Sequence, residues 1–183
     1  MEYLGLYDEN GNYTEERIER SKKKEVPNGR YFRIVIIFIQ NSNGEFLIQK
    51  VSKEKGNEYA TTGGHVQDGI SSIDTVKQEV FEELGLSLNN NDILLFETVQ
   101  HSLAFQDCYY VKKDVNINTL KLQVEEVNSV EWMTIEKINY LIKMGSFRKS
   151  NISPFKDLIS ILETEKGFEF PLYKVTNLTS KKK

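Results

Sequence analysis

Three glutamates recur at helical spacing after a glycine-rich turn, in the segment GGHVQDGISSIDTVKQEVFEELGL that spans residues 63–86. A helix advances about 100° per residue, so Glu79, Glu82 and Glu83 would share an arc of roughly 100°. Like charges at these spacings destabilise an isolated helix by about 0.2–0.5 kcal/mol per pair. A cation such as Mg²⁺ or Mn²⁺ would offset that cost, because hard cations take carboxylate oxygens as ligands. The spacing therefore predicts a metal site on one side of this helix.

A solvated acidic face is the simpler interpretation of three neighbouring glutamates, and on charge alone it would be preferred. The glycines that precede the helix reverse this preference. Gly63, Gly64 and Gly69 would let backbone amides approach a phosphate closely. Gly63, Gly64 and His65 are therefore candidate substrate-binding residues, with His65 either a phosphate contact or a bystander in the loop.

The segment after the glycines has the signals of one helix that would carry the glutamates. Ser71 or Ser72 is the predicted N-cap, and Gly85 would end the helix in the left-handed conformation. Asp74 in the first turn suits the helix dipole. The apolar residues at helical spacing form the expected buried stripe, namely Ile73, Val76, Val80 and Leu84.

Strand signals surround this helix on both sides in the chain. Residues 31–40 are a nearly continuous run of β-branched and aromatic residues, typical of a strand buried on both faces. Asn43-Gly44 predicts a hairpin turn into a partner strand that ends near residue 51. Further strands are predicted over 93–100, 103–111 and 127–133, and further helices over 134–144 and from Ser153-Pro154 onward. This order predicts α/β or α+β layers around a mixed sheet.

The whole chain has 183 residues, which fits one domain with additions at its ends. We expect an N-terminal hairpin or arm over 1–29, a main domain over 30–165 and a tail over 166–183. The basic run at 22–24 is interpreted as a solvated face rather than a binding patch.

Composition argues against several classes of function. A net charge of −3 gives no general attraction to nucleic acid or to an anionic membrane. No apolar run is long enough to span a bilayer. The single cysteine, Cys108, excludes an intrachain disulfide and a cysteine-built zinc site. The first ten residues have neither the basic start nor the apolar core of a signal peptide, so the cytoplasm is the expected location.

The stretch 64–86 resembles the Nudix box of the Nudix hydrolases. In order along the chain, the box consists of a glycine, five residues of any type, a glutamate, seven residues of any type and the pair arginine-glutamate. An aliphatic residue, one residue of any type, two glutamates, one residue of any type, a glycine and a final aliphatic residue follow. The matching residues keep one register and are Gly64, Glu79, Val80, Glu82, Glu83, Gly85 and Leu86. The resemblance extends over roughly residues 30–145, and YLGLYDENGNYT near the N-terminus is similar to an arm in a branch that resembles isopentenyl-diphosphate isomerase.

The resemblance implies a Nudix-type α/β/α sandwich with a mixed sheet. It also implies Mg²⁺-dependent hydrolysis of a diphosphate linkage, in a nucleoside diphosphate derivative or a similar small diphosphate. Glu79, Glu82 and Glu83 would then be the metal ligands and part of the catalytic site. Similar proteins are commonly dimers, so a homodimer remains open.

The resemblance breaks at two positions that act together in the family. Ile70 stands where the box has its first glutamate, and Gln78 stands where it has the arginine that pairs with that glutamate and holds the catalytic loop. Losing both is chemically coherent, because replacing only one would leave a charge unpaired. Lys77 points toward the apolar side and Asp68 lies two residues ahead of the missing glutamate, so neither is a close substitute. The box keeps its metal ligands and loses the internal Glu–Arg ion pair, which we call the internal strut.

A general base must come from elsewhere once the first glutamate of the box is missing. In the family, an acidic residue upstream of the tryptophan-containing strand often serves as ligand or base. Glu125 and Glu126 match that place, and we choose Glu126 as the candidate. The alternative, that both are solvated loop carboxylates, stays open.

Two other functions compete with hydrolysis. The missing Glu–Arg pair favours a weak or inactive Nudix-fold module that binds a nucleotide-like ligand or has a regulatory role. The three retained ligands argue against it, since a pure binder has no need of them. Isomerisation of isopentenyl diphosphate is disfavoured, because the family's catalytic cysteine precedes the box whereas Cys108 follows it.

Overall fold

The computed structural model describes residues 1–164, so the tail predicted over 166–183 lies outside the described residues. The strands are β1 (Tyr3–Tyr7), β2 (Tyr13–Glu19), β3 (Phe32–Gln40), β4 (Phe46–Val51), β5 (Tyr59–Ala60), β6 (Thr62–His65), β7 (Leu94–Gln100), β8 (Ala104–Lys112) and β9 (Val127–Met133). The helices are α1 (Ser72–Leu84), α2 (Ile135–Lys143) and α3 (Lys149–Thr164), with 3₁₀ turns at Arg20–Glu25, Lys53–Lys55, Asn90–Asp92 and Ile117–Thr119.

The apolar run predicted as a strand buried on both faces is β3, the central strand of the main sheet. Its side chains alternate between two hydrophobic clusters. Val35 and Ile37 pack with Val76 and Val80 of α1, whereas Phe38 packs with α2 and α3 side chains on the other face. The continuous hydrophobic pattern thus reflects a strand between two helical layers.

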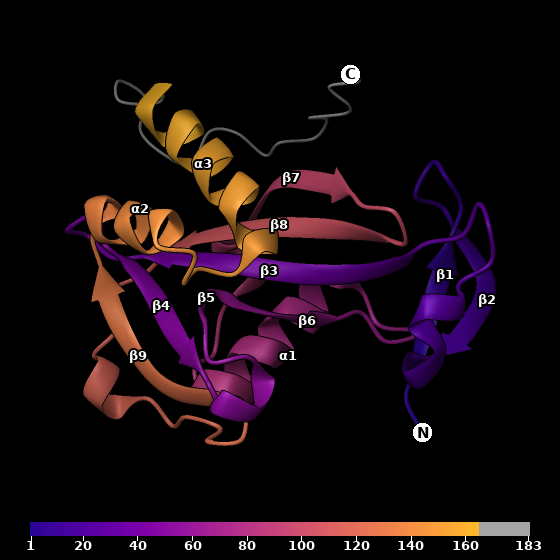
Figure 1. Ribbon diagram of the computed structural model, residues 1–183, viewed down its shortest axis with the longest axis horizontal. Helices are drawn as coiled ribbons and strands as arrows, with labels where there is room; N and C mark the ends of the chain where they lie inside the picture. The colour runs from indigo at the N-terminus through magenta and orange to yellow at the C-terminus, as the bar shows by residue number, and fades with distance from the viewer. Residues whose placement is uncertain (165–183) are drawn as a thin grey trace.

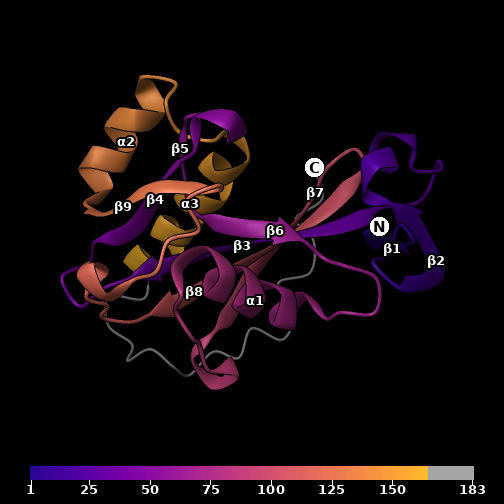
Figure 2. The ribbon, with the colours of Figure 1, turned by 90° about the horizontal axis from the view of Figure 1, so that it is seen from below.

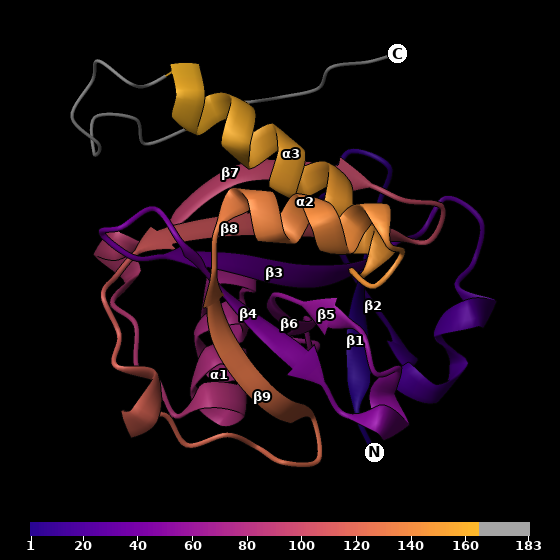
Figure 3. The same ribbon diagram turned by 60° about the vertical axis from the view of Figure 1, so that its left-hand side comes forward.

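The main sheet is mixed, as predicted. Its strand order is β5-β4-β3-β8-β7, with β6 also paired to β3 and β9 to β4. β3 and β8 are parallel, and the other pairs are antiparallel. α2 and α3 cover one face (Figure 1) and α1 covers the other (Figure 2). Figure 3 shows β9 lying beside β4. The α/β/α arrangement expected from the resemblance is confirmed.

Helix α1 begins and ends where the sequence predicts. Ser71 is the N-cap, and its hydroxyl accepts a hydrogen bond from the amide of Asp74 at 3.1 Å. Gly85 closes the helix with φ +66°, a conformation that glycine adopts without strain. The expected apolar stripe faces the sheet, with Val76, Val80 and Leu84 buried and Ile73 partly buried. The acidic side of α1 is consequently fixed relative to β6.

The predicted start of the last helix at Ser153-Pro154 is wrong. α3 begins at Lys149, and Pro154 lies inside it. Proline has no N–H to donate to the carbonyl four residues earlier, which leaves the Ser150 carbonyl without that intrahelical bond. The buried Gln106 side chain supplies the missing donor, with Nε2 2.9 Å from the Ser150 carbonyl oxygen. A long-range hydrogen bond therefore makes proline acceptable in this turn.

The N-terminal hairpin forms a separate two-stranded sheet of β1 and β2, seen to the right in Figure 1. Tyr7 and Tyr31 exchange backbone hydrogen bonds of 2.8 and 2.9 Å and join the hairpin to the start of β3. Leu4 and Leu6 pack with Phe32 in a third, smaller hydrophobic cluster. The hairpin is thus attached to the main sheet through both backbone pairing and apolar contact.

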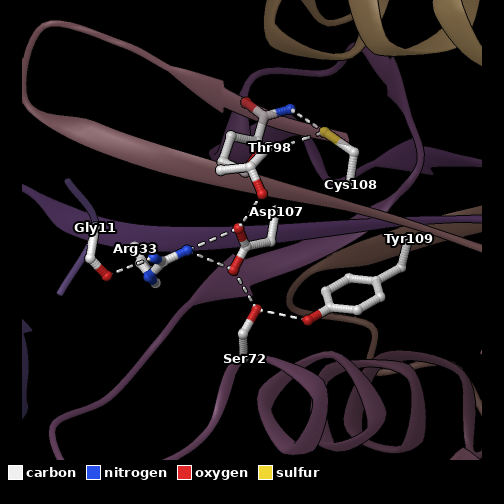
Figure 4. A network of polar contacts seen from close by, with 8 residues as sticks. Gly11, Arg33, Ser72, Thr98, Asp107, Cys108 and Tyr109 are labelled. Atoms are coloured by element: carbon white, nitrogen blue, oxygen red, sulfur yellow. Dashed lines mark hydrogen bonds and ion pairs between the residues drawn. The ribbon is translucent and has the colours of Figure 1, made fainter. Parts of the chain in front are cut away.

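A buried polar network joins the hairpin, the sheet and the start of α1 (Figure 4). The Asp107 carboxylate accepts hydrogen bonds from Arg33 at 2.8 and 3.0 Å, from Thr98 at 2.8 Å and from Ser72 at 2.5 Å. Arg33 also donates to the Gly11 carbonyl at 3.0 Å. Because one carboxylate contacts β3, β7 and α1, it fixes where the first turn of α1 lies.

We expect Asp107→Asn to lower the free energy of unfolding by about 1–2 kcal/mol. The amide would present a donor in place of one oxygen, so it would face groups that themselves donate. Urea denaturation measures the change, with Asp92→Asn at an exposed position as the matched control. Equal stability of the two variants would contradict a structural role for the network.

Among residues 1–164, no helix is long and apolar enough to cross a membrane.

Candidate functional site

The predicted site residues line one pocket of about 470 Å³ between α1, β6 and the loop ahead of β9. They are Gly63, Gly64, His65, Glu79, Glu82, Glu83 and Glu126. The pocket is also lined by Glu2 just before β1, by Arg20 in the 3₁₀ turn after β2, and by residues of β3, β4 and the start of α3. Segments that are distant in the sequence therefore meet around the acidic side of α1.

The two glycines of β6 allow close packing around this pocket. A Cβ atom on Gly64 would lie 2.0 Å from Oε1 of Glu79, and one on Gly63 would lie 2.3 Å from the Val35 carbonyl oxygen. Both distances are shorter than van der Waals contact. Gly64 thus makes room for the Glu79 carboxylate, a packing reason that the sequence did not reveal.

Burial and mutual repulsion raise the pKa of two α1 carboxyls. Burial is the main cause of the rise for Glu79, whose pKa is about 8, and the charges of Glu83 and Glu82 add to it. Burial likewise raises the pKa of Glu83 to about 7, with Glu126 contributing, although the hydrogen bond from Gln49 opposes the shift. These four glutamates therefore form one electrostatic cluster.

The donor set of this cluster fits a hard divalent cation. Carboxylate oxygens are preferred ligands of Mg²⁺ and Mn²⁺, and a bound cation would cancel the repulsion that raises the two pKa values. Within residues 1–164, no three acidic, histidine or cysteine side chains already converge tightly enough to hold a metal. Glu79, Glu82 and Glu83 would have to change rotamer to share one ion.

We expect the metal-free protein to lose stability as the pH rises from about 4.5 to about 8. Glu79 binds its proton more tightly in the folded protein than in the unfolded chain, so its contribution is fully present below the unfolded pKa and is lost as the pH passes the folded one. Because the Glu79 side chain is partly exposed, we expect a loss of about 1–2 kcal/mol in the free energy of unfolding, less than the full pKa shift would give. The Tm should then fall by about 2–8 °C, because 1 kcal/mol corresponds to about 2–4 °C for a chain of this size.

Thermal unfolding in a chelating buffer at several pH values measures this effect. Glu79→Gln should flatten the profile, whereas Glu163→Gln, at an exposed position on α3, should leave it unchanged. If Tm falls with pH equally steeply in Glu79→Gln and in the unmodified protein, the pKa of Glu79 is not raised by folding.

Glu126 enters the pocket, whereas its neighbour Glu125 is exposed and does not line it. Backbone and side-chain hydrogen bonds hold this loop to Ser52, with Ser52 N 2.9 Å from the Glu126 carbonyl oxygen and Ser52 Oγ 2.8 Å from that of Glu125. Glu126 also pairs with Lys55 at 2.8 Å. The geometry therefore favours Glu126 over Glu125 as the acidic residue that reaches the site.

His65 is partly buried against the N-terminal arm. Its Nε2 lies 2.9 Å from Nζ of Lys23, and burial followed by the charges of Lys23 and Arg20 lowers its pKa to about 4. The ring is therefore neutral at pH 7 and accepts a hydrogen bond from the ammonium group. Interpreting the whole basic run at 22–24 as a solvated face was wrong for Lys23, which is partly buried here.

The loop between β6 and α1 is not tied to α1 through Ile70 and Gln78. Ile70 is 39% exposed at the pocket, and Gln78 donates to Oε1 of Glu82 at 2.7 Å. The loop is instead tied to the N-terminal hairpin by Asp68, whose carboxylate accepts from the Tyr13 hydroxyl at 2.6 Å. Its amide donates to the Tyr3 carbonyl at 2.9 Å. Asp68 is therefore an anchor to another part of the chain.

Several pocket residues had no recognisable signal in the sequence. They are Glu2, Arg20, Gln49, Lys55, Arg148 and Asn151. Arg148 reaches the pocket because residues 146–148 pair with β5, with the Arg148 amide 2.8 Å from the Tyr59 carbonyl oxygen. These residues reach the pocket through contacts between distant segments, so no local sequence pattern predicts them.

Cys108 lies outside this pocket. It is 0% exposed, in the cluster on the α2 and α3 side of the sheet, and burial raises the pKa of its thiol. The Cys108 thiol therefore cannot contact a ligand that is bound among the glutamates of the pocket.

Comparisons with known proteins agree with this architecture. A NUDIX domain model matches residues 30–154. The chain is 31% identical over 151 residues to the "Uncharacterized Nudix hydrolase lin0387" of Listeria innocua, covering 80% of this chain and 88% of that protein. It is 28% identical over 127 residues to nucleoside triphosphatase NudI of Enterobacter sp., covering 59% and 85% respectively.

Solved structures give the same result for the fold. DR0079 from Deinococcus radiodurans has a TM-score of 0.63 and 25% identity, covering 79% of this chain and 91% of that chain. The MutT protein of Methanosarcina mazei has a TM-score of 0.56 and 23% identity, covering 78% and 98%. These structures agree with the fold, and the domain match together with the relative from Listeria innocua shows that the chain belongs to the Nudix hydrolase family.

Proposed function

We propose that this Nudix protein hydrolyses a diphosphate linkage in a nucleoside diphosphate derivative or a similar small diphosphate, with Mg²⁺ or Mn²⁺. The observation that carries the proposal is the coupled carboxylate cluster, in which burial and like charges raise the pKa values of Glu79 and Glu83. Perturbed carboxyls in a pocket are typical of sites that bind cations or transfer protons. The nucleoside triphosphatase activity named for the relative from Enterobacter supports a nucleotide-like substrate.

Glu79, Glu82 and Glu83 would hold the cation, which neutralises phosphate charge and lowers the pKa of the attacking water when bound. Glu126 would take the proton from that water, because it reaches the same pocket from a different segment. Lys55 pairs with Glu126 at 2.8 Å and would keep its carboxylate oriented. The partly buried, neutral His65 is assigned no proton transfer.

A catalytically weak nucleotide-binding or regulatory module is the second candidate. The exposed Ile70 and the Gln78–Glu82 hydrogen bond favour it, because they leave α1 without a charged tie to the catalytic loop. Isomerisation is not favoured, since the only cysteine is buried outside the pocket.

A panel of nucleoside diphosphate derivatives and small diphosphates, assayed with Mg²⁺ and again with a chelator, separates the two candidates. Hydrolysis predicts phosphate-containing products from at least one compound, seen by ³¹P NMR only with the metal. Ligand binding in thermal-shift measurements without product formation from any compound would favour the binding module and overturn the hydrolase proposal.

A further inference from the structure

Asn151, near the start of α3, carries a buried donor that no described residue satisfies. The side chain is 1% exposed, and Oδ1 accepts a hydrogen bond from the Thr61 amide at 3.0 Å. This bond sets the orientation of the amide group and leaves Nδ2 as the free end. Within residues 1–164, Nδ2 has no hydrogen-bond partner. An unsatisfied buried donor is destabilising, so a ligand oxygen that accepts a hydrogen bond from it would remove that cost.

The same end of α3 faces the pocket with other donors. α3 is a 16-residue helix, and Arg148, Ser150 and Asn151 all line the pocket. The backbone amides of Arg148 and Asn151 already donate to the Tyr59 and Arg148 carbonyls at 2.8 and 3.0 Å, so this end of α3 contributes mainly through the helix dipole, which places partial positive charge there. Nδ2 of Asn151 therefore adds a fixed donor to a helix end that already favours an anion.

Arg148 adds a full positive charge at this end of the pocket. Its Nε donates to Oε1 of Glu58 at 2.6 Å, which leaves the terminal guanidinium nitrogens for another acceptor. Its charge lowers the pKa of Glu83, so the guanidinium lies close to the carboxylate cluster. The α3 end thus presents donors and positive charge directly beside the proposed cation site.

We propose that Arg148, Asn151 and the first turn of α3 form an anion-binding subsite that takes a phosphate group of the substrate. This inference rests on the proposed function, in which Glu79, Glu82 and Glu83 hold the cation and its phosphate. The second phosphate of the diphosphate, or a further one, would accept from Asn151 Nδ2 and pair with Arg148. The subsite therefore selects compounds with an anionic group beside the cation-held phosphate over compounds with one phosphate alone.

Inorganic phosphate tests the subsite on the full chain, with a chelator present and at about 0.15 M salt to screen general charge effects. We expect saturable binding that shifts the side-chain amide NMR signal of Asn151. Arg148→Gln should weaken the binding at least fivefold, and it leaves the backbone bond between Arg148 and Tyr59 in place. Lys149→Gln removes the same charge from the next residue, which is exposed and does not line the pocket, so it should change affinity less than twofold.

Any of three results would overturn the subsite. One is phosphate binding that Arg148→Gln and Lys149→Gln weaken equally, which would indicate general charge attraction. The second is saturation with phosphate while the Asn151 signal stays unmoved, and the third is no binding at all. Because the measurement needs neither metal nor turnover, its failure is distinguishable from failure of the proposed hydrolysis.

Discussion

Replacing Glu82 and Glu83 together by glutamine is expected to lower Mg²⁺-dependent turnover by about 100- to 1,000-fold, the range seen when one preorganised group that stabilises transition-state charge is lost. Glutamine keeps the size of each side chain but provides no negative charge for the cation. At Glu83 it also keeps an oxygen that can accept from Gln49, whose Nε2 lies 2.7 Å from the native carboxylate. The folded structure should therefore survive while metal binding is lost.

The same variant should also lose the rise in Tm that Mg²⁺ or Mn²⁺ causes. A cation that binds only the folded protein raises Tm by mass action, by an amount that grows with its concentration over its Kd. Glu163→Gln, at an exposed position on α3, is the control and should retain both the shift and the turnover. A metal-induced shift that persists in Glu82→Gln with Glu83→Gln would place the cation elsewhere in the chain.

Asp68→Ala is expected to lower kcat by about 100-fold, because a misplacement of about 1 Å at a reacting centre has this effect. The substitution removes the carboxylate that accepts from Tyr13 at 2.6 Å and pairs with Arg17 at 3.6 Å. The loop between β6 and α1 would then lose its side-chain contacts with the N-terminal hairpin. The metal-induced Tm shift should remain, since the glutamates of α1 are untouched, and this result separates loop position from metal binding.

An ion pair built inside the loop should compensate for the lost anchor. Ile70→Glu with Gln78→Arg adds the two charges at residues that line the pocket and have room for longer side chains, because both are exposed. We expect the pair to be tolerated, to raise turnover of the unmodified protein several-fold, and to restore most of the activity of Asp68→Ala. The two effects together would show that the N-terminal hairpin holds the loop in position, as the Glu–Arg ion pair does in the family.

Glu16→Ala is the matched control for this anchor. Glu16 lies on the same hairpin and pairs with Arg30 rather than with the loop, so its removal should leave kcat within about twofold. Reduced turnover in a well-folded Ile70→Glu, Gln78→Arg variant would show that a different loop arrangement has replaced the strut.

The elements that could be predicted are those whose signals are local. β3 was visible as an unbroken apolar run because it has a helical layer on each side. α1 was visible through its cap at Ser71, its buried stripe and Gly85. The start of α3 was misplaced because the donor that satisfies the Ser150 carbonyl comes from Gln106, 44 residues away.

The site residues also fall into those that the sequence predicts and those that only long-range contacts place. The glutamates of α1 follow from their spacing. Glu126 follows from the resemblance to the Nudix family, in which an acidic residue often precedes the tryptophan-containing strand, here β9. Arg148 and Asn151 could not be found, because backbone pairing with β5 and a hydrogen bond to Thr61 bring them to the pocket. The sequence predicts only a weak substitute at Asp68, because this residue lies two positions ahead of the missing glutamate. Its role as an anchor could not be predicted, since its partner Tyr13 lies 55 residues away on a hairpin whose position no sequence pattern specified.

The most direct test of hydrolysis at this carboxylate cluster is turnover in H₂¹⁸O, followed by ³¹P NMR of the products. If water attacks phosphorus with the aid of the cation, one ¹⁸O atom should appear in one phosphate product, only with Mg²⁺ or Mn²⁺, and not with the variant that carries Glu82→Gln and Glu83→Gln. Products that carry no ¹⁸O on phosphorus, or equal labelling by the unmodified protein and that variant, would contradict the proposed role of the cluster.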